Sequence, residues 1–454
     1  MSGRFDAIIV GAGQAGPALA ARLDAAGQNV AIVERHLFGG TCVNTGCMPT
    51  KTLVASAYAA HLARRAAEYG LDVGPVVVDM KRVAARAHQV TLNSRGSIES
   101  WLEGLPRTTV IRGHARFVSA DTLTVDGEEI SAARIFLNVG GRAAIPDMPG
   151  LGEIDYLTNT SILALETVPR HLVVVGGSYI GLEFAQMYRR FGAEVTVVEK
   201  GPRLIAREDA DVSEAVRGIL ESEGIAVHVG VGNVAFRREG GEIAVGIGDA
   251  EVIASHVLIA VGRRPNTDDL GLDRAGVRLD ARGYIVVDDR LATNVPGIFA
   301  LGDCNGRGAF THTAYNDFEI VAANLLDGAD RRLSQRILGY ALYTDPPLGR
   351  VGLTETQARE IGRPILVGTR PMTRVGRAIE KGETQGFMKI VVDAETKRIL
   401  GASILGTGGD EAIHGILDIM NADVPYTVLQ WAVPIHPTVS ELIPTMLGDL
   451  KPVP

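Results

Sequence analysis

The feature that most constrains this chain is a unit of strand, glycine-rich turn, helix and strand that occurs twice. In the first copy, an apolar strand leads into the turn GAGQAG at residues 11–16, and the next strand ends at Glu34. In the second copy, an apolar strand leads into the turn GGSYIG at residues 176–181, and the next strand ends at Glu199. Such a repeat predicts an α/β fold with two Rossmann-like dinucleotide-binding domains.

Both turns contain the residue types that bind a dinucleotide. Glycine lets the backbone approach a pyrophosphate at the N-terminus of the following helix, and the distal acid can bind the ribose hydroxyls. The expected contacts are therefore the turn glycines and acids, namely Gly11, Gly13, Gly16, Glu34, Gly176, Gly181 and Glu199. The alternative is a pair of ordinary βαβ turns. Ser178 departs from the glycine pattern of the second turn, but serine is small and we still expect binding there.

Glu199 also bears on the choice of nicotinamide cofactor. A carboxylate at this position accepts hydrogen bonds from a ribose 2′-hydroxyl and repels a 2′-phosphate, which favours NADH. Lys200 and Arg203 follow closely and leave NADPH open as an alternative, unless they are simply solvated surface charges.

The length, the net charge and the lack of long apolar runs argue against a nucleic-acid-binding protein and against a membrane protein. The 454 residues suggest about three domains, and a net charge of −8 without long basic runs argues against nucleic-acid binding. No apolar run reaches the length of a membrane span, and the N-terminal residues do not resemble a signal peptide. The sequence therefore predicts a cytoplasmic protein that does not enter a membrane.

A close cysteine pair stands out in a chain with only three cysteines. Cys42 and Cys47 lie in GGTCVNTGCMPTK at residues 39–51, soon after Glu34, so we expect both near the first nucleotide. Their spacing places the thiols near one helical turn, within plausible disulfide reach, and a helix N-terminus would lower a thiol pKa. The alternatives are a buried free thiol and a metal site. A metal site needs more ligands than this segment offers, so none is expected.

The GGTCxNxGCxPxK pattern resembles the class I pyridine nucleotide–disulfide oxidoreductases, which include glutathione reductase, dihydrolipoamide dehydrogenase and mercuric reductase. The resemblance runs from about residue 6 to residue 447 and is closest to the mercuric-reductase-like branch. It implies that FAD occupies the first dinucleotide site and NAD(P)H the second. It also implies that Cys42 is the interchange thiol, which meets the substrate, and that Cys47 is the charge-transfer thiol against the flavin.

Further positions match by the same resemblance. Lys51 and Glu183 resemble the ion pair beside the flavin, and Tyr179 resembles the aromatic gate over the nicotinamide pocket. Asp303, in the second FAD motif Gly302-Asp303, is expected on the flavin's sugar chain unless it is only a strand-end turn residue. The remaining expected cofactor contacts are Thr41, Lys51, Gly140 and Gly262.

One stretch departs from the family pattern, and one cysteine lacks a partner cysteine. The stretch Asn138-Val139-Gly140 stands where the family usually has Ala-Thr-Gly, so a hydroxyl contact is lost there. Cys304 has no second cysteine near it and is interpreted as a small residue beside a cofactor turn.

The C-terminal segment contains a candidate acid–base pair. His436 and Glu441 resemble the family's general acid–base and its orienting carboxylate, which act on the disulfide of the other subunit of a homodimer. Imidazole titrates in the range that thiol exchange requires. Glu441 also matches a capping box with Thr438, and both interpretations can hold together.

The resemblance implies four segments. These are an FAD-binding domain at 1–147, an NAD(P)H-binding domain at 148–263, a return to the FAD-binding region at 264–336, and an α+β dimerisation domain at 337–454.

The predicted function is electron transfer from NAD(P)H through flavin and Cys42–Cys47 to a small disulfide or another oxidised sulfur compound. Mercuric or other metal-ion reduction is the alternative, although the C-terminal cysteine pair of mercuric reductases is absent, because the last cysteine is Cys304. A redox-sensing or binding flavoprotein is the alternative from another class, and the pair of His436 and Glu441 favours turnover instead.

Overall fold

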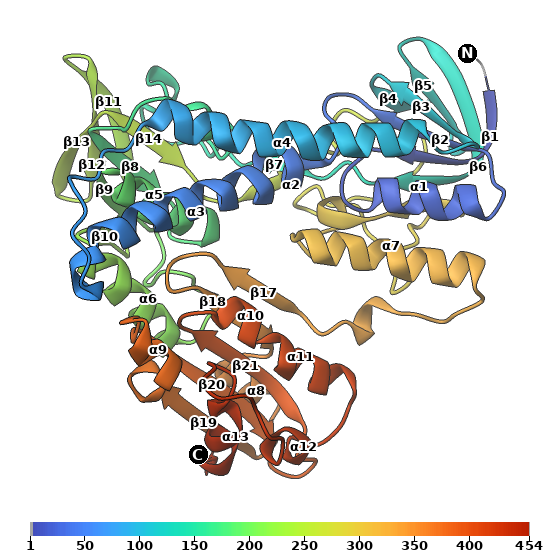
Figure 1. The fold of residues 1–454 in the computed structure, drawn as a ribbon. Helices are drawn as coiled ribbons and strands as arrows, with labels where there is room; N and C mark the ends of the chain where they lie inside the picture. The colour runs from blue at the N-terminus through green and yellow to red at the C-terminus, as the bar shows by residue number, and fades with distance from the viewer. Residues whose placement is uncertain (1–2, 454) are drawn as a thin grey trace.

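The computed structural model describes residues 3–453, whose strands form three larger sheets with helices packed around them (Figure 1). The first sheet runs in the order β3 (Thr108–Arg112), β2 (Val30–Glu34), β1 (Gly3–Val10), β6 (Glu128–Leu137), β5 (Thr122–Val125) and β4 (Ala115–Phe117). A late strand, β16 (Ile298–Ala300), pairs in parallel with β6, so the chain returns to this sheet after building the second. Strands β1, β2, β3 and β6 are also parallel, and β4 and β5 continue the sheet in antiparallel fashion.

Helices attach to this sheet from two distant parts of the chain. The helices are α1 (Gly16–Ala25), α2 (Gly40–Thr45), α3 (Cys47–Arg64), α4 (Met80–Glu103) and α7 (Thr311–Leu326). Helix α1 packs beside α7, while α3 and α4 run alongside each other from the first sheet towards the second (Figure 1). The apolar residues of β1 from Ala7 to Val10 are buried between these layers, which explains the unbroken apolar run at the start of the sequence.

The second unit repeats the first. Its parallel sheet has the order β10 (Ala226–His228), β9 (Glu194–Val198), β8 (His171–Val175) and β14 (His256–Ile259). Helices α5 (Tyr179–Phe191) and α6 (Ala210–Ser222) accompany it. An antiparallel sheet is formed by β11 (Val234–Glu239), β12 (Glu242–Ile247) and β13 (Ala250–Ala254).

A short two-stranded sheet joins the two units. It pairs β7 (Gly141–Ala143) with β15 (Arg263–Pro265) in antiparallel fashion. The chain therefore leaves the first unit and returns to it along the same short sheet.

The third sheet is antiparallel throughout and lies apart from the first sheet (Figure 1). Its order is β17 (Gly339–Leu342), β18 (Leu348–Gly352), β21 (Ile399–Leu405), β20 (Phe387–Asp393), β19 (Ile365–Pro371) and β22 (Lys451–Pro452). Its helices are α8 (Glu355–Glu360), α9 (Gly376–Glu380), α10 (Gly409–Ala412), α11 (His414–Asn421), α12 (Thr427–Gln430) and α13 (Leu442–Gly448). Two parallel units and one antiparallel unit with helices make up the predicted α/β architecture.

Two helices, and not one continuous helix, occupy most of residues 50–101. Helix α3 ends at Arg64, and after a 3₁₀ turn the chain runs without regular structure until Asp79 caps α4. The Asp79 side chain accepts a hydrogen bond from the Arg82 backbone N–H, which is the usual reason for a helix to begin there. Gly70, in the left-handed region at φ 76°, ends the 3₁₀ turn.

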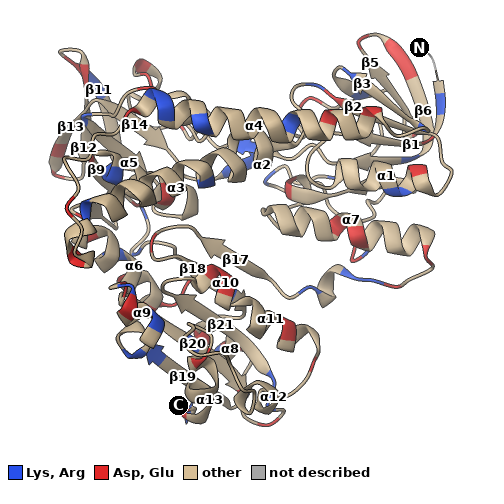
Figure 2. Cartoon of the chain, viewed as in Figure 1, with Lys and Arg blue, Asp and Glu red and all other residues tan. Residues whose placement is uncertain are grey.

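Charged residues of both signs are distributed over the whole molecule. Lys and Arg are interspersed with Asp and Glu on most elements (Figure 2). Within residues 3–453, no helix is both long enough and apolar enough to cross a membrane.

Candidate active site

The first glycine turn is built so tightly that side chains are excluded. Gly11 has φ 100°, and a Cβ there would lie 2.4 Å from the carbonyl oxygen of Asn138. A Cβ on Gly16 would lie 2.3 Å from the carbonyl oxygen of Gly11. The Glu34 carboxylate accepts hydrogen bonds from the backbone N–H groups of Ala12, at 2.9 Å, and His36, at 2.8 Å. Glu34 is thereby fixed beside the turn.

The second turn has the same construction. Gly176 has φ 117°, and a Cβ on Gly181 would lie 2.0 Å from the Gly176 carbonyl oxygen. The Glu199 carboxylate accepts hydrogen bonds from the backbone N–H groups of Gly177 and Gly201, both at 2.6 Å. The two acids therefore hold equivalent positions in the two units, as the sequence repeat predicts.

A cavity of about 650 Å³ begins at the first turn and extends to the cysteine pair, a volume typical of cofactor sites. Residues expected at the first nucleotide or the redox centre line it, namely Gly11, Gly13, Glu34, Thr41, Cys42, Cys47, Lys51, Gly140, Tyr179, Glu183 and Asp303. Gly16 is not in the lining, but its N–H donates to the Asn138 side chain at 3.0 Å. Gly176, Gly181, Glu199 and Gly262 belong to the second unit and lie outside this lining.

The residues of the cavity match the chemistry of FAD. A glycine cradle and a helix N-terminus suit a pyrophosphate, and Glu34 suits a ribose. Asp303 lines the same cavity, where burial raises the pKa of its carboxyl, and its partner Arg263 has Nε 3.5 Å from Asp303 Oδ2.

The cysteine pair lies on two helices rather than on one. Cys42 is in α2 and Cys47 is the first residue of α3, with a break at Gly46. A Cβ on Gly46 would lie 2.8 Å from the Thr41 carbonyl oxygen, so the break needs glycine. The expectation of a single helical turn is therefore wrong, but the two side chains do lie within reach of each other.

The proton of this pair lies on Cys42. A hydrogen bond from Cys42 lowers the pKa of Cys47 to about 6, and the hydroxyl of Thr311 and the charge of Lys51 act in the same direction against burial. The same bond to Cys47, together with burial, raises the pKa of Cys42. At neutral pH the pair is therefore a Cys47 thiolate beside a Cys42 thiol.

An ion pair connects the two nucleotide units next to this thiolate. Lys51 Nζ on α3 lies 2.6 Å from Glu183 Oε2 on α5, and the Glu183 side chain is buried. The second carboxylate oxygen accepts the backbone N–H of Tyr343 at 3.0 Å. The Tyr343 ring also lies under Lys51, with 4.6 Å between Nζ and the ring centroid. Both oxygens of Glu183 are thus satisfied, which holds Lys51 at the cavity wall.

Tyr179 is the first residue of α5 and lies at the same wall. Its ring packs edge-on against Phe310 and Tyr340, at centroid distances of 6.1 and 5.3 Å. Its hydroxyl is buried and interacts with the hydroxyl of Tyr340. Burial raises the pKa of Tyr179 to about 12.

His436 lies on the third unit and does not line the cavity. Its Nδ1 is 2.8 Å from Glu441 Oε2, and its side chain is 80% exposed. The backbone N–H of Glu441 donates to Thr438 Oγ1 at 3.2 Å, as a capping box would have it. The Glu441 carboxylate contacts His436 instead of the helix end, so the expected His436–Glu441 pair and half of the capping box are both present.

Three residues of the site did not emerge from the sequence. Asn138 accepts the Gly16 N–H and donates to the Leu301 carbonyl at 3.0 Å, joining the turn to β16. Thr311 Oγ1 lies 3.3 Å from Cys47 Sγ, and Arg263 donates to the Gly141 carbonyl at 2.5 Å. The departure from Ala-Thr-Gly signalled Asn138, but no spacing in the sequence links the other two to the site.

Comparison with known proteins agrees with this geometry. Residues 5–317 match the pyridine nucleotide-disulphide oxidoreductase family, and residues 339–447 match the dimerisation domain of that family. The probable pyridine nucleotide-disulfide oxidoreductase RclA of Escherichia coli is 35% identical over 459 residues, covering 99% of this chain and 100% of that protein. A mercuric reductase of Streptomyces lividans is 35% identical and covers 95% of this chain and 93% of its own length.

A solved structure shares the fold. It is described as the Cu(II) complex of the HOCl-induced flavoprotein disulfide reductase RclA from Escherichia coli, with a TM-score of 0.91, 34% identity and coverage of 99% and 100% of the two chains. The predicted fold class is thereby confirmed. The chain belongs to the pyridine nucleotide-disulphide oxidoreductases and is an NAD(P)H-dependent flavoprotein disulfide oxidoreductase that carries the family's dimerisation domain.

Proposed function

We propose that this protein reduces a low-molecular-weight disulfide, or a related oxidised sulfur compound, with electrons from NADH. The net reaction is NADH + H⁺ + RSSR → NAD⁺ + 2 RSH. The observation that carries the proposal is the Cys42–Cys47 pair at the wall of the nucleotide cavity, with its thiolate on Cys47.

The protonation states of Cys42 and Cys47 determine the order in which the two sulfurs react. Cys42 retains its proton, so a base must remove that proton before the Cys42 sulfur attacks RSSR and releases one RS⁻. The Cys47 thiolate then attacks the Cys42 sulfur in the mixed disulfide, which releases the second thiolate and leaves a Cys42–Cys47 disulfide. Both released thiolates take up protons. FAD held in the cavity beside Lys51 and Cys47 would supply the relay of two electrons from the nicotinamide to this disulfide.

Cofactor binding is assigned residue by residue. Gly11, Gly13 and Glu34 would hold the adenosine and pyrophosphate part of FAD, and Asp303 would hold its sugar chain. Lys51, paired with Glu183, would lie beside the ring. Equivalent contacts to the nicotinamide dinucleotide would come from Gly176, Gly181, Glu199 and Gly262, and Thr41 and Gly140 would complete the FAD site.

The base is proposed to be His436 of the other subunit in a homodimer. His436 is exposed in the single chain although Glu441 orients it, so its task lies outside its own subunit. The preceding segment exposes Trp431, Val433 and Ile435, and Val433 is 96% exposed. Apolar side chains grouped in this way indicate an interface, which agrees with the dimerisation domain.

NADH is the proposed donor because of Glu199. Its carboxylate is fixed by two backbone N–H groups at the end of β9, where the ribose 2′ position is read. A 2′-phosphate would meet this fixed negative charge at close range.

The domain division is proposed as predicted, at 147/148, 263/264 and 336/337. The pairing of β7 with β15 supports it, because the chain crosses between the nucleotide units close to the first two of these boundaries.

Metal-ion reduction is the second candidate. The mercuric reductase relative and the Cu(II) complex of the RclA structure favour it. The third cysteine of this chain cannot deliver a metal, because Cys304 is fully buried and burial raises its pKa to about 12. Within residues 3–453, no group of three or more His, Cys, Asp or Glu side chains is arranged to hold a metal ion.

The deciding experiment measures NADH consumption by the FAD-loaded protein with a panel of small disulfides, sulfur oxides, Hg(II) and Cu(II). Turnover with a disulfide that is lost in Cys42→Ser is the expected result. Turnover with metal ions alone would transfer the proposal to the second candidate. A protein that reacts with one equivalent of NADH but turns over with no acceptor would instead be a redox sensor.

A further inference from the structure

The Tyr179 ring packs against two aromatic rings from outside its own unit, Phe310 and Tyr340. We call these two rings the clasp. Phe310 precedes α7 of the FAD unit, and Tyr340 lies on β17 of the dimerisation unit. Phe310 and Tyr340 stack on each other at a centroid distance of 5.7 Å, and Tyr179 packs edge-on against both. The position of Tyr179 therefore depends on how firmly this stack is held.

The Tyr340 ring is tied down by its hydroxyl. That hydroxyl donates to Glu208 Oε1 at 2.5 Å. Arg350, which lies opposite Tyr340 on the neighbouring strand β18, donates from Nε to the two Glu208 oxygens at 3.2 and 3.1 Å. Glu208 and Arg350 are each 2% exposed, so the bonds are formed away from water.

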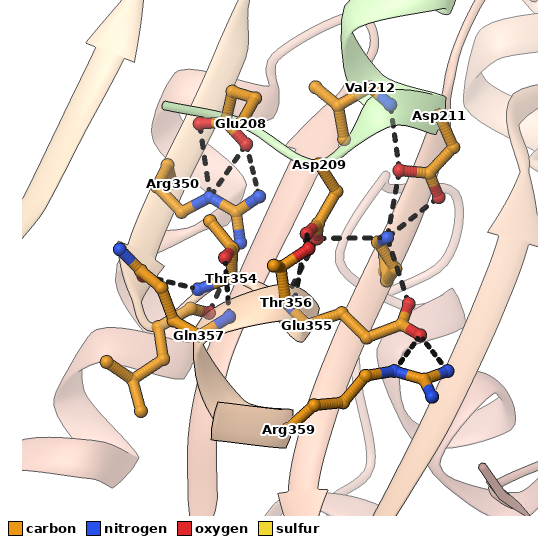
Figure 3. Close-up of polar contacts among 12 residues, drawn as sticks. Glu208, Asp209, Asp211, Val212, Arg350, Thr354, Glu355, Thr356, Gln357 and Arg359 are labelled. Atoms are coloured by element: carbon orange, nitrogen blue, oxygen red, sulfur yellow. Dashed lines mark hydrogen bonds and ion pairs between the residues drawn. The ribbon is translucent and has the colours of Figure 1, made fainter. Parts of the chain in front are cut away.

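Glu208 is held in place by hydrogen bonds on both sides of it in its loop. Ile205 in the same loop donates its N–H to the carbonyl oxygen of Gly177 in the second glycine turn, at 2.8 Å. The next residue, Asp209, accepts hydrogen bonds from the backbone N–H groups of Glu355 and Thr356 at the start of α8, at 2.9 and 3.0 Å (Figure 3). Although burial opposes it, these bonds hold the pKa of Asp209 well below its usual range.

We propose that Tyr340 is a positioning residue that holds Tyr179 in its closed position through the hydroxyl bond to Glu208. The inference rests on the proposed role of Tyr179 as the gate of the nicotinamide pocket. The buried Tyr179 hydroxyl also interacts with the Tyr340 hydroxyl, so both the ring and the hydroxyl of Tyr340 contact the gate. These contacts stabilise the closed gate.

A weaker clasp raises the population of the open gate and therefore the apparent affinity for any ligand that needs it open. Tyr340→Phe keeps the ring and removes the hydroxyl that donates to Glu208 and interacts with the Tyr179 hydroxyl. We expect it to lower the Kd of NAD⁺ for the oxidised, FAD-loaded dimer by about three- to tenfold, the effect of one hydrogen bond. The KM for NADH should fall by a similar factor.

Binding of a second ligand, ADP-ribose, distinguishes an effect on the gate from an effect on the rest of the nucleotide site. ADP-ribose occupies the same site but has no nicotinamide ring, so it does not require Tyr179 to move. Its Kd, measured in the same calorimetric titration, should change by less than about twofold in Tyr340→Phe. Equal changes for both ligands would overturn the proposal, because Tyr340 would then shape the nucleotide loop and not the gate.

The matched control is Tyr58→Phe, which removes another tyrosine–glutamate bond to the dimerisation unit. Tyr58 on α3 donates to Glu383 at 2.9 Å and makes no ring contact with Tyr179. This variant should leave both Kd values unchanged. Unchanged NAD⁺ binding in Tyr340→Phe, with a changed value in Tyr179→Ala, would refute the clasp and leave the gate intact. Unchanged binding in both variants would refute the gate and the clasp together.

Discussion

The hydroxyl of Thr311 lies 3.3 Å from the sulfur of Cys47, although 264 residues separate them in the sequence. Thr311 is the first residue of α7, and Cys47 is the first residue of α3. The Cys47 sulfur therefore lies at the start of its own helix and receives a hydrogen bond from the start of another. Both effects favour the thiolate.

Replacing Thr311 by valine should weaken that preference. The pKa of Cys47 is lowered to about 6, so the thiolate is present above about pH 6 and is lost as the pH falls through that value. Loss of the hydroxyl bond should raise the pKa by about half a unit to one unit. The long-wavelength absorption of the two-electron-reduced, FAD-loaded protein, titrated against pH, should show this shift. Thr311→Ser keeps the hydroxyl and should titrate like the wild type, whereas a shift in both variants would refute the assignment.

Replacing Glu199 by glutamine should reduce the preference for NADH over NADPH. The change removes the negative charge and keeps one oxygen to accept the Gly177 N–H. We expect the ratio of kcat/KM for NADH to that for NADPH to fall about tenfold, since hydrogen bonds to charged groups are worth about 1.5–3 kcal/mol. Glu34→Gln makes the same change in the first unit and should leave the ratio unaltered. Equal use of both cofactors by the wild type would show that Lys200 and Arg203 dominate.

His436 offers a test of the composite site. His436→Ala should slow disulfide reduction by about 10²–10⁴, the usual contribution of a positioned acid–base, with little effect on reduction of the flavin by NADH. Mixing His436→Ala chains with Cys42→Ser chains should then restore activity, because each heterodimer has one site with both lesions and one with neither. Random pairing predicts about a quarter of wild-type activity. Confirmed chain exchange without recovery would show that His436 does not serve the other subunit.

Lys389 should be critical for stability. Its side chain is 3% exposed, and its Nζ lies 3.1 Å from Asp209, 2.7 Å from Asp211 and 3.2 Å from Glu355. Lys389→Met leaves Asp209 and Asp211 without this cation, while Glu355 keeps its ion pair with Arg359 at 2.8 Å, and should destabilise the protein by about 3–5 kcal/mol. Thermal unfolding should show a loss of at least about 5 °C in Tm.

A second lysine of the same unit provides the control for that measurement. Lys381 pairs with Glu383 at 2.7 Å, but its side chain is 37% exposed. Lys381→Met should cost less than Lys389→Met, because Lys381 is partly exposed and its one carboxylate partner, Glu383, keeps the hydrogen bond from Tyr58. An equal decrease in Tm in the two lysine variants would contradict the stabilising role given to Lys389 and its three carboxylate partners.

Local pattern was enough to determine the two nucleotide units and the redox pair. Glycine at 11 and 176 is required by the positive φ of each turn, and the acids at 34 and 199 follow at the end of the next strand. These are short-range requirements of backbone geometry, so they can be read from neighbouring residues. The spacing of the cysteine pair could be read in the same way, although the break at Gly46 could not.

Contacts between distant segments were decided by the tertiary structure alone. Thr311 reaches Cys47, Tyr340 reaches Glu208, and Asn138 bridges the first turn to β16. None of these pairs has a characteristic spacing, because each depends on how segments far apart in the sequence pack against one another. The sequence by itself therefore determined which chemical groups this protein possesses. Only the packing of distant segments brought Thr311 to Cys47 and Tyr340 to Tyr179, since each of these contacts joins residues that lie far apart in the sequence.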